Sequence, residues 1–221
     1  MPIQDGLVLY LDAGDLSSYP GSGETWTDLS GNGNNGTLEN GVGYDSANGG
    51  FLSFDGVDDY VNLGAFFTYQ EFTISLWVYP GSTQVQYADI FDNNHTDFRN
   101  FVLQQNDLDT NQYAFGTQDA SGVISASGTL TLAANIWTHL SFTFSPSTRV
   151  IAYINGAFHS QGALAGGRNI LYQSQTLSIA RWSAGGRHWN GRMGNFMAYN
   201  RVLTASEVQQ NFNATRSRFG I

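Results

Sequence analysis

A ten-residue stretch, residues 181–190, is rich in side chains that bind ligands. It reads RWSAGGRHWN, with two tryptophans, two arginines and one histidine among smaller residues. Carbohydrate sites pair a flat aromatic ring, which covers the apolar face of a sugar, with planar polar groups that bind its hydroxyls. We therefore predict a ligand-binding loop whose contact residues are Trp182, Arg187, His188, Arg181 and Trp189. For Trp189, the alternative is packing at the edge of a sheet against Gly191 and Arg192.

A second stretch has the composition of a calcium-binding loop. Residues 28–36 read DLSGNGNNG, so one carboxylate is followed by a run of glycine and asparagine. Calcium takes about six to eight oxygen ligands, and such a loop exposes its carbonyls while Asp28 supplies negative charge. One interpretation is therefore structural calcium near Asp28 and Asn32. The other is an Asx-turn, in which the Asp28 carboxylate accepts hydrogen bonds from amides of its own loop.

The acidic residues do not form the pattern expected of a glycoside hydrolase. Such enzymes of the retaining kind hold two carboxylates about 5 Å apart. On one strand, a Glu-x-Asp-x-Glu triplet gives that geometry, because alternate side chains share a face. The four glutamates lie outside any such triplet; they are Glu24, Glu39, Glu71 and Glu207. Asp55, Asp58 and Asp59 are close in sequence, but they occupy a turn.

Composition also disfavours other catalytic chemistries. The chain has no cysteine and no lysine, so neither a thiol nucleophile nor a Schiff base is available. The four histidines lack the His-x-x-His and His-Glu-x-x-His spacings of zinc sites. We therefore predict that the protein is not an enzyme.

The charge balance disfavours two classes of partner. Nine arginines stand against eighteen acidic residues, which gives a net charge of −9 at pH 7. So acidic a chain repels nucleic-acid phosphates and anionic membranes. No apolar run approaches the roughly 18 residues of a membrane-spanning helix, and residues 1–5 lack the regions of a signal peptide. We expect no nucleic-acid partner, no membrane insertion and no signal peptide in this chain.

Length and turn spacing favour one all-β domain over residues 1–221. With 26 glycines and 4 prolines, the sequence is typical of short strands joined by tight turns. Residues 72–79 alternate between an apolar set and a set that includes Trp77 and Tyr79, so one of the two faces is a candidate binding or subunit surface. The pair Asn155-Gly156 predicts a β-hairpin.

A single short helix is expected close to the C-terminus. Thr204 and Glu207 have the spacing of a capping box, in which each side chain binds the backbone amide of the other residue. Apolar residues follow at Val208 and Phe212. Residues beyond a last element are commonly poorly ordered, so we predict a loosely held tail over residues 214–221.

Five short motifs occur in a characteristic order. They are DLSGNGNNG at 28–36, FDGVDDYV at 54–61, FTISLWV at 72–78, WNGR at 189–192 and YNRVLT at 199–204. The ordered set resembles the laminin-G-like branch of the concanavalin A-like lectin/glucanase superfamily, with further similarity to pentraxins. This resemblance implies an antiparallel two-sheet jelly-roll sandwich with one short C-terminal helix. Since the ends of such a sandwich need partners, we expect residues 192–199 beside the first strand.

The resemblance also implies a calcium site. Relatives often carry an aspartate in the late strand after a Gly-Arg-hydrophobic sequence, and here that position is Gly194, followed by Asn195. The ligands of a structural Ca²⁺ that the resemblance implies are Asp28, Asn32, Asp12 and Asn195.

Residues 5–14 and 199–215 are similar to such domains in virion proteins of tailed phages. The resemblance implies a non-catalytic carbohydrate-binding or adhesion module, displayed on a phage virion as a decoration or fibre-type protein. Its implied partners are a glycan or host cell-surface polysaccharide, other virion proteins and further copies of itself as a homo-oligomer. Its implied location is the virion surface or another extracellular place. The alternatives are a purely structural assembly domain of a virion and a glycoside hydrolase.

Overall fold

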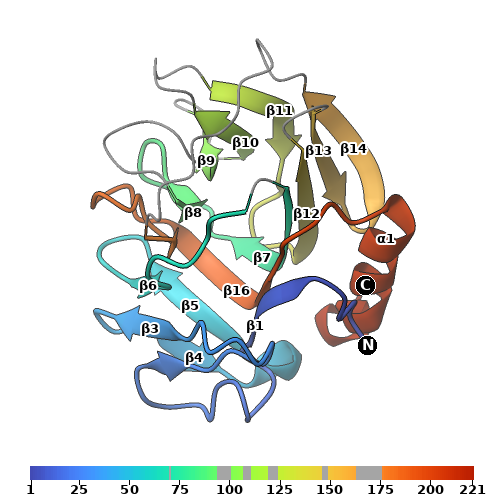
Figure 1. Cartoon of the computed structure of the whole chain (residues 1–221). Helices are drawn as coiled ribbons and strands as arrows, with labels where there is room; N and C mark the ends of the chain where they lie inside the picture. Colours follow the sequence, from blue (N-terminus) through green and yellow to red (C-terminus); the bar gives the residue numbers. More distant parts are fainter. Residues whose placement is uncertain (70, 94–100, 107–110, 119–123, 146–148, 163–175) are drawn as a thin grey trace.

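Alternating side chains along the strands build two antiparallel sheets that pack face to face (Figure 1). The computed structural model describes residues 1–69, 71–93, 101–106, 111–118, 124–145, 149–162 and 176–221. Over these residues, each sheet has eight strands. The two-sheet sandwich confirms the fold class predicted from the sequence.

The first sheet, sheet A, contains both the earliest and the latest strands. Its strands follow the order β14-β13-β12-β7-β16-β5-β4, and β1 also pairs with β16. Their bounds are β1 Leu7–Asp12, β4 Gly43–Asp45, β5 Phe51–Asp55, β7 Phe72–Pro80, β12 Thr138–Ser145, β13 Arg149–Ile154, β14 Ala157–Gly162 and β16 Asn190–Tyr199.

The second sheet, sheet B, has the order β11-β10-β9-β8-β15-β6-β3-β2. Its bounds are β2 Thr25–Trp26, β3 Gly36–Glu39, β6 Tyr60–Asn62, β8 Asp89–Asp92, β9 Phe101–Gln105, β10 Gln112–Gln118, β11 Ile124–Thr131 and β15 Ser178–Ile179. Outside the sheets lie the helix α1 Ala205–Thr215 and two 3₁₀-helices, η1 Ala47–Gly49 and η2 Arg216–Phe219. No helix in the described ranges has the length and apolar character to cross a membrane.

The long strand β16 joins the two ends of the chain. Its first part pairs with β5 and its second part with β1, while β7 lies along its other edge. This confirms the expected pairing of the first and last strands. Two side chains add to it: the Tyr199 hydroxyl donates to the Ile3 carbonyl at 3.2 Å, and Asn211 Oδ1 accepts from the Ile3 amide at 2.8 Å. The N-terminal segment is thus held by residues from the far end of the chain.

Phenylalanine side chains fill much of the space between the sheets. Phe142 of β12 stacks on Phe115 of β10 with 4.4 Å between ring centroids, and Phe72 of β7 stacks on Phe144 at 5.0 Å. Burying one such side chain contributes about 1.5–3 kcal/mol. The apolar set predicted along residues 72–79 therefore faces the core, and its four members are fully buried: Phe72, Ile74, Leu76 and Val78.

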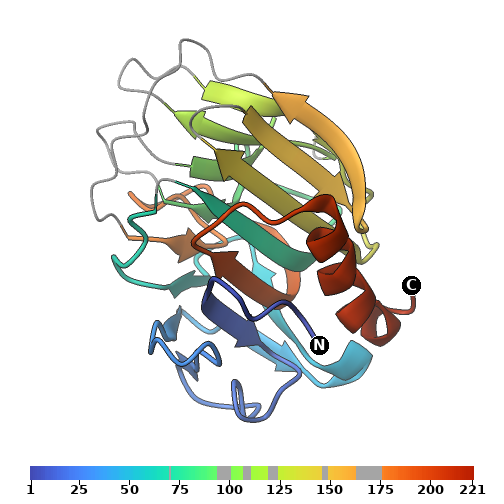
Figure 2. The same cartoon turned by 45° about the vertical axis from the view of Figure 1, so that its right-hand side comes forward.

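The opposite face of β7 is covered by the C-terminal segment, which crosses sheet A (Figure 2). Trp77 is fully buried, and its Nε1–H donates to Thr215 Oγ1 of α1 at 2.7 Å. The expectation that this face is an open binding or subunit surface is wrong at Trp77, because α1 must bury its apolar stripe against an element of the sheet. Tyr79, two residues further along β7, remains partly exposed.

The last residues do not form the loose tail predicted over residues 214–221. Within η2, Phe219 is 5% exposed and packs on Trp77 at 4.3 Å and on Trp137 at 4.6 Å. Arg218 Nη1 donates to both carboxylate oxygens of Asp12, at 2.7 and 2.8 Å. The prediction of a loose tail is wrong because Phe219 packs against Trp77 and Trp137, which are distant in sequence.

The predicted hairpin is confirmed at Asn155 and Gly156. Strands β13 and β14 pair across these residues, whose φ angles are 50° and 77°, as a type I′ turn requires. Asn155 Oδ1 also accepts from the His139 amide at 3.0 Å. A Cβ at Gly156 would lie 3.0 Å from Phe212, so glycine also allows the close approach of α1.

The predicted capping box begins α1 and is confirmed. Thr204 Oγ1 accepts from the Glu207 amide at 3.3 Å, and Glu207 Oε2 accepts from the Thr204 amide at 2.8 Å. Arg201 donates to both Glu207 oxygens, at 2.6 and 3.1 Å. The hydrogen bond from Arg201, followed by that from the Thr204 amide, lowers the pKa of Glu207 to about 2.

We expect Thr204→Ala to lower the free energy of unfolding by about 1 kcal/mol, because the Glu207 amide loses its acceptor at the helix N-terminus. Urea unfolding followed by circular dichroism measures this change. Ser206→Ala, in the same exposed turn, is the matched control and should cause no loss. Equal stability of the Thr204→Ala variant and the wild type would contradict the capping role.

Candidate functional site

The loop predicted to bind a ligand follows β15 and leads into β16. We call residues 180–189 the Trp182 loop. The Trp182 amide donates to the Gly186 carbonyl at 3.1 Å, and the Gly185 amide donates to the Trp182 carbonyl at 2.8 Å. The Arg187 guanidinium lies 4.7 Å from the centre of the Trp182 ring and 5.5 Å from that of Tyr87. A closed turn thus presents a half-buried indole stacked on a cation.

Two further predicted residues lie around a tyrosine of strand β6. The Arg181 guanidinium is 3.6 Å above the ring of Tyr60, and the His188 ring centroid is 6.5 Å from that of Tyr60. His188 Nδ1 is 3.4 Å from the Asp59 carbonyl oxygen. Trp182, Arg187, Arg181 and His188 therefore do gather around one loop. The structure adds Tyr60 and Tyr87, which sequence reasoning missed because both are about a hundred residues away.

Trp189 is not part of this surface. Its side chain is fully buried, its ring lies 6.1 Å from Phe54, and its Nε1–H donates to the Tyr113 hydroxyl at 3.3 Å. A Cβ at Gly191 would collide with the indole, so the ring packs against that glycine. The alternative interpretation of edge packing therefore describes Trp189, and its assignment as a contact residue is corrected.

A buried acid of strand β8, Asp92, anchors the Trp182 loop, and Asp89 lies buried on the same strand. Asp92 Oδ1 accepts from the Ser183 amide at 3.0 Å and from the Ser183 hydroxyl at 2.6 Å. Asp89 is fully buried and accepts from Gln104 Nε2 at 2.9 Å. Burial, and then the nearby Asp92 carboxylate, raise the pKa of Asp89 well above its ordinary value, while the Arg187 charge opposes this. These contacts fix the conformation in which the loop presents its aromatic ring.

The residues of the predicted calcium loop satisfy one another. Asp28 Oδ1 accepts from the amides of Tyr10 and Ser30, both at 2.9 Å, and its Oδ2 accepts from the Ser30 hydroxyl at 2.8 Å and the Asn34 amide at 3.0 Å. Asn32 Nδ2 donates to Ser30 Oγ at 2.9 Å. Four donors aimed at one carboxylate leave it unsuited to a cation. The contacts match the Asx-turn interpretation.

The other two predicted calcium ligands lie on the outer face of sheet A. Besides Arg218, the Asp12 carboxylate accepts from the Tyr10 hydroxyl and the Gly14 amide, each at 2.9 Å. Asn195, its neighbour across β1 and β16, is buried, and its amide has no hydrogen-bond partner among the described residues. Because Asp12 is already neutralised by Arg218, these residues do not fit a calcium ion in this arrangement.

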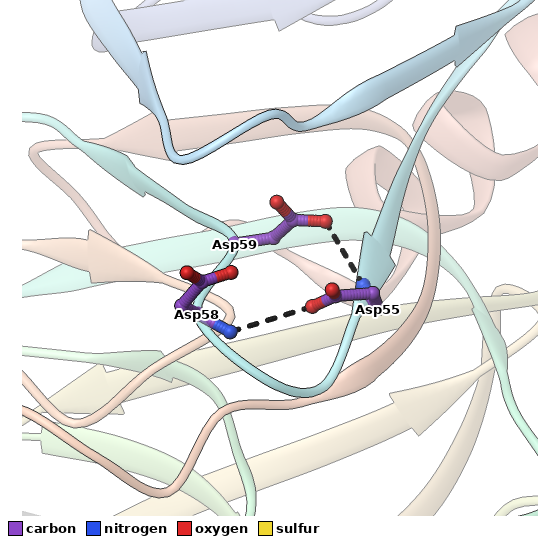
Figure 3. Close-up of side chains that lie close together, drawn as sticks. All are labelled: Asp55, Asp58 and Asp59. Carbon is purple, nitrogen blue, oxygen red and sulfur yellow. Dashed lines mark hydrogen bonds between the residues drawn. The ribbon is translucent and has the colours of Figure 1, made fainter.

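Three acids form a tight turn between β5 and β6 (Figure 3). Oxygens of Asp55, Asp58 and Asp59 lie within 4.8 Å of one another. Asp55 Oδ1 accepts from the Val57 amide at 2.8 Å, and Asp59 Oδ2 accepts from the Asp55 amide at 3.0 Å. The backbone hydrogen bonds, that from Val57 first, lower the pKa of Asp55, whereas burial raises that of Asp59. The carboxylates of Asp55 and Asp59 thus hold the turn together.

A pocket of about 510 Å³ opens beside this turn, and sequence reasoning missed it. Its polar lining includes Ser53, Asp55, Tyr79, Asn135, Asn190 and Arg192. We call it the Arg192 pocket.

Strand pairing explains why these residues meet. One row across four strands pairs Gly43 with Ser53, Ser53 with Arg192, and Arg192 with Tyr79. The next row on the same face pairs Asp55 with Asn190, because side chains two positions apart point the same way. The sequence signal was there, as polar residues at alternate positions of three strands, but the register that aligns them was not visible.

Comparison with known proteins places the chain among lectin-like folds. A family model described as the concanavalin A-like lectin/glucanases superfamily, of the laminin G type, matches residues 55–209. No curated protein matches the sequence.

Three solved structures illustrate the similarity. The binding domain of Paraclostridial Mosquitocidal Protein 1 is 21% identical with a TM-score of 0.75, and the match covers 96% of this chain and 52% of that one. The binding domain of Botulinum Neurotoxin DC, in complex with SialylT, is 14% identical with a TM-score of 0.75 over 96% and 52% of the two chains. Domain 4 of AbnA, a GH43 extracellular arabinanase from Geobacillus stearothermophilus, in complex with arabinotriose, is 18% identical with a TM-score of 0.71 over 93% and 97%.

The chain thus spans about half the length of the toxin binding domains it matches. At these identities the likeness shows the sandwich fold.

Proposed function

The chain belongs to the concanavalin A-like lectin/glucanase superfamily, and from that membership we propose that it is a non-catalytic carbohydrate-binding module. The Trp182 loop is its glycan-facing surface. The observation that carries this proposal is the stacking of Arg187 on Trp182 at 4.7 Å, with Arg181 and His188 placed around Tyr60 beside it. Aromatic surface and planar donors are thereby brought together, as sugar recognition requires.

The loop is held in place before any ligand arrives. Its ends are fixed by backbone hydrogen bonds from the Ala180 amide to the Ile90 carbonyl and from the Trp189 amide to the Ala180 carbonyl, both at 2.9 Å. Asp92 binds the middle of the loop through Ser183. A surface ordered in this way loses little conformational entropy on binding. Two of the compared structures are described as complexes with SialylT and with arabinotriose, which supports a saccharide as the ligand class.

Glycoside hydrolysis is less well supported as a function. Asp55, Asp58 and Asp59 form one cluster of acids within the described ranges, and the carboxylates of Asp55 and Asp59 each accept a backbone amide of their own turn. Glu207 is occupied by the capping box and Arg201. A hydrolase needs one carboxylic acid free to protonate the leaving group.

Trp182→Ala should weaken glycan binding by about thirtyfold or more, because removal of a central aromatic contact costs about 2 kcal/mol or more. A glycan array, read with and without calcium, first identifies a ligand, and titration calorimetry then compares the variants. Phe158→Ala removes an aromatic side chain that is 60% exposed on β14, and serves as the matched control.

We expect the melting temperature of the Trp182→Ala variant to stay close to that of the wild type. Failure of the wild type to bind any glycan on the array would overturn the proposed function. Unchanged affinity in the Trp182→Ala variant would remove the Trp182 loop as the binding surface.

Display on a phage virion, as implied by the sequence resemblance, stays a prediction. A virion module is expected to form a defined oligomer or to dock on another capsid or tail protein, which light scattering and negative-stain microscopy detect. A strictly monomeric protein with no virion partner would count against this setting.

A further inference from the structure

We propose that the Arg192 pocket binds an acidic saccharide, with the Arg192 guanidinium holding a sugar carboxylate and the polar residues around it binding hydroxyls. This inference rests on the proposed carbohydrate-binding function and goes beyond it by assigning a second site and a ligand class.

The state of Arg192 is the first reason. Its guanidinium lies 4.9 Å from the ring centre of Phe51 and 4.8 Å from that of Tyr79, so two aromatic rings contact it. Throughout the described ranges, the Arg192 guanidinium forms no hydrogen bond or ion pair with another residue, although the backbone of Arg192 pairs within the sheet. A guanidinium carries five N–H donors in a rigid fork that matches a carboxylate. Arg192 is therefore oriented and still available for a ligand.

The neighbouring lining supplies groups for sugar hydroxyls. The side-chain amides of Asn190 and Asn135 have no hydrogen-bond partner in the part of the chain that the structure describes, and both line the pocket. Asp55 Oδ1 is used by its own turn, which leaves its second oxygen as an acceptor. An amide offers a donor and an acceptor side by side, the pair of groups that adjacent hydroxyls of a sugar ring require.

Glycines shape the space in front of these groups. Gly43 begins the row that continues through Ser53 and Arg192, and Gly81, two residues after Tyr79, also lines the pocket. A Cβ at Gly81 would lie 2.5 Å from Asn190 Oδ1, so a larger residue there would displace the Asn190 amide. The volume of about 510 Å³ falls within the range of about 300–1,000 Å³ typical of small-molecule sites.

The pocket also adjoins the Trp182 loop. Asp59 lines the pocket and its carbonyl oxygen lies 3.4 Å from His188 Nδ1, while Asn190 directly follows the loop. The net charge of −9 repels polyanions at long range. We therefore assign short oligosaccharides with isolated uronic acid residues to the pocket, so that one carboxylate meets one guanidinium.

The test compares two forms of the same ligand on the intact chain. Short oligosaccharides that contain glucuronate or galacturonate are titrated calorimetrically, alongside the same oligosaccharides with the carboxylates methyl-esterified. We expect the wild type to bind the free acids at least about tenfold more tightly than the esters. Arg192→Gln should bring the two affinities together, Arg192→Lys should keep a smaller preference, and Arg216→Gln, on an arginine of η2 outside the pocket, should keep the full preference.

The outcomes separate this inference from the proposed function. Equal affinity of the wild type for acids and esters, or a preference that survives in Arg192→Gln, would overturn the acidic-saccharide assignment and leave carbohydrate binding in place. Absence of binding to any saccharide would overturn both. The ester comparison needs no variant, so it decides the assignment even where Arg192→Gln fails to fold.

Discussion

Acidification from pH 6.5 to pH 3 is expected to remove about 4 kcal/mol of folding free energy through His139 alone. Burial lowers the pKa of this fully buried imidazole from 6.5 to about 3. Between these values, the unfolded chain binds a proton that the folded protein does not bind. The contribution of His139 is therefore fully present above pH 6.5, declines as the pH falls, and is lost near pH 3.

The surroundings of His139 explain why the charged form is so unfavourable. Nε2 lies 3.0 Å from Ser75 Oγ, and Ser141 Oγ donates to the same Ser75 oxygen at 2.8 Å. Nδ1 has no hydrogen-bond partner within the described part of the molecule. The rings of Trp77 and Phe212 lie 5.3 and 5.7 Å from the imidazole. Among the described residues, no carboxylate is placed to stabilise an imidazolium.

Denaturant unfolding of the wild type and of His139→Gln at pH 7 and pH 4 measures the effect. The glutamine variant should lose much less stability on acidification, because its side chain does not titrate. His159→Gln alters an exposed histidine of β14 and should retain the wild-type pH dependence. If wild type and His139→Gln lost equal stability between the two pH values, the buried neutral imidazole would not be the cause.

Phe219→Ala should lower the free energy of unfolding by about 3–5 kcal/mol, the usual cost of deleting a buried aromatic ring. Phe219 packs on Trp77 and Trp137. A Cβ at Gly194 would collide with the Phe219 ring. The absence of a side chain at this position of β16 therefore leaves the space that the ring fills. Removal of the ring leaves a cavity between η2 and sheet A.

Equilibrium unfolding in guanidinium chloride measures this loss. Phe158→Ala deletes the same side chain from an exposed position and should change stability by less than about 0.5 kcal/mol. A Phe219→Ala variant as stable as this control would restore the prediction of a loose C-terminal tail.

Individual elements were predictable because their signals are local, whereas the two-sheet sandwich was implied by the family resemblance of motifs spread along the chain. The alternation along residues 72–79, the hairpin at Asn155-Gly156 and the capping box at Thr204 are each read from a few neighbouring residues. The ordered tail was not predictable in this way. A single Phe219 among arginine and serine residues gives no local pattern, and its burial depends on Trp77 and Trp137, which lie far away in sequence.

The same distinction between local signals and long-range contacts applies to the candidate sites. The association of Trp182 with Arg187 followed from their presence in one short segment. The Arg192 pocket did not, because Ser53, Tyr79 and Arg192 come from three strands whose register only the folded sheet establishes. The sequence could not decide between the two interpretations of Asp28 for a related reason. An isolated carboxylate in a glycine-rich loop can accept hydrogen bonds from backbone amides as readily as it can bind a cation, and here it accepts from the amides.

The pairing of β1 with β16 determines when the first strand can join its sheet during translation. Residues 7–12 emerge from the ribosome well before their partners at 195–199 and before Arg218, which contacts Asp12. At about 5–20 residues per second, the first strand waits on the order of ten seconds or more for its neighbour. The chain must lose the entropy of closing this long loop before the contacts between β1 and β16 can form. Refolding should therefore be slow, in the range of about milliseconds to seconds. The nascent chain therefore carries this apolar strand without its β16 partner until residues 195–199 have been made.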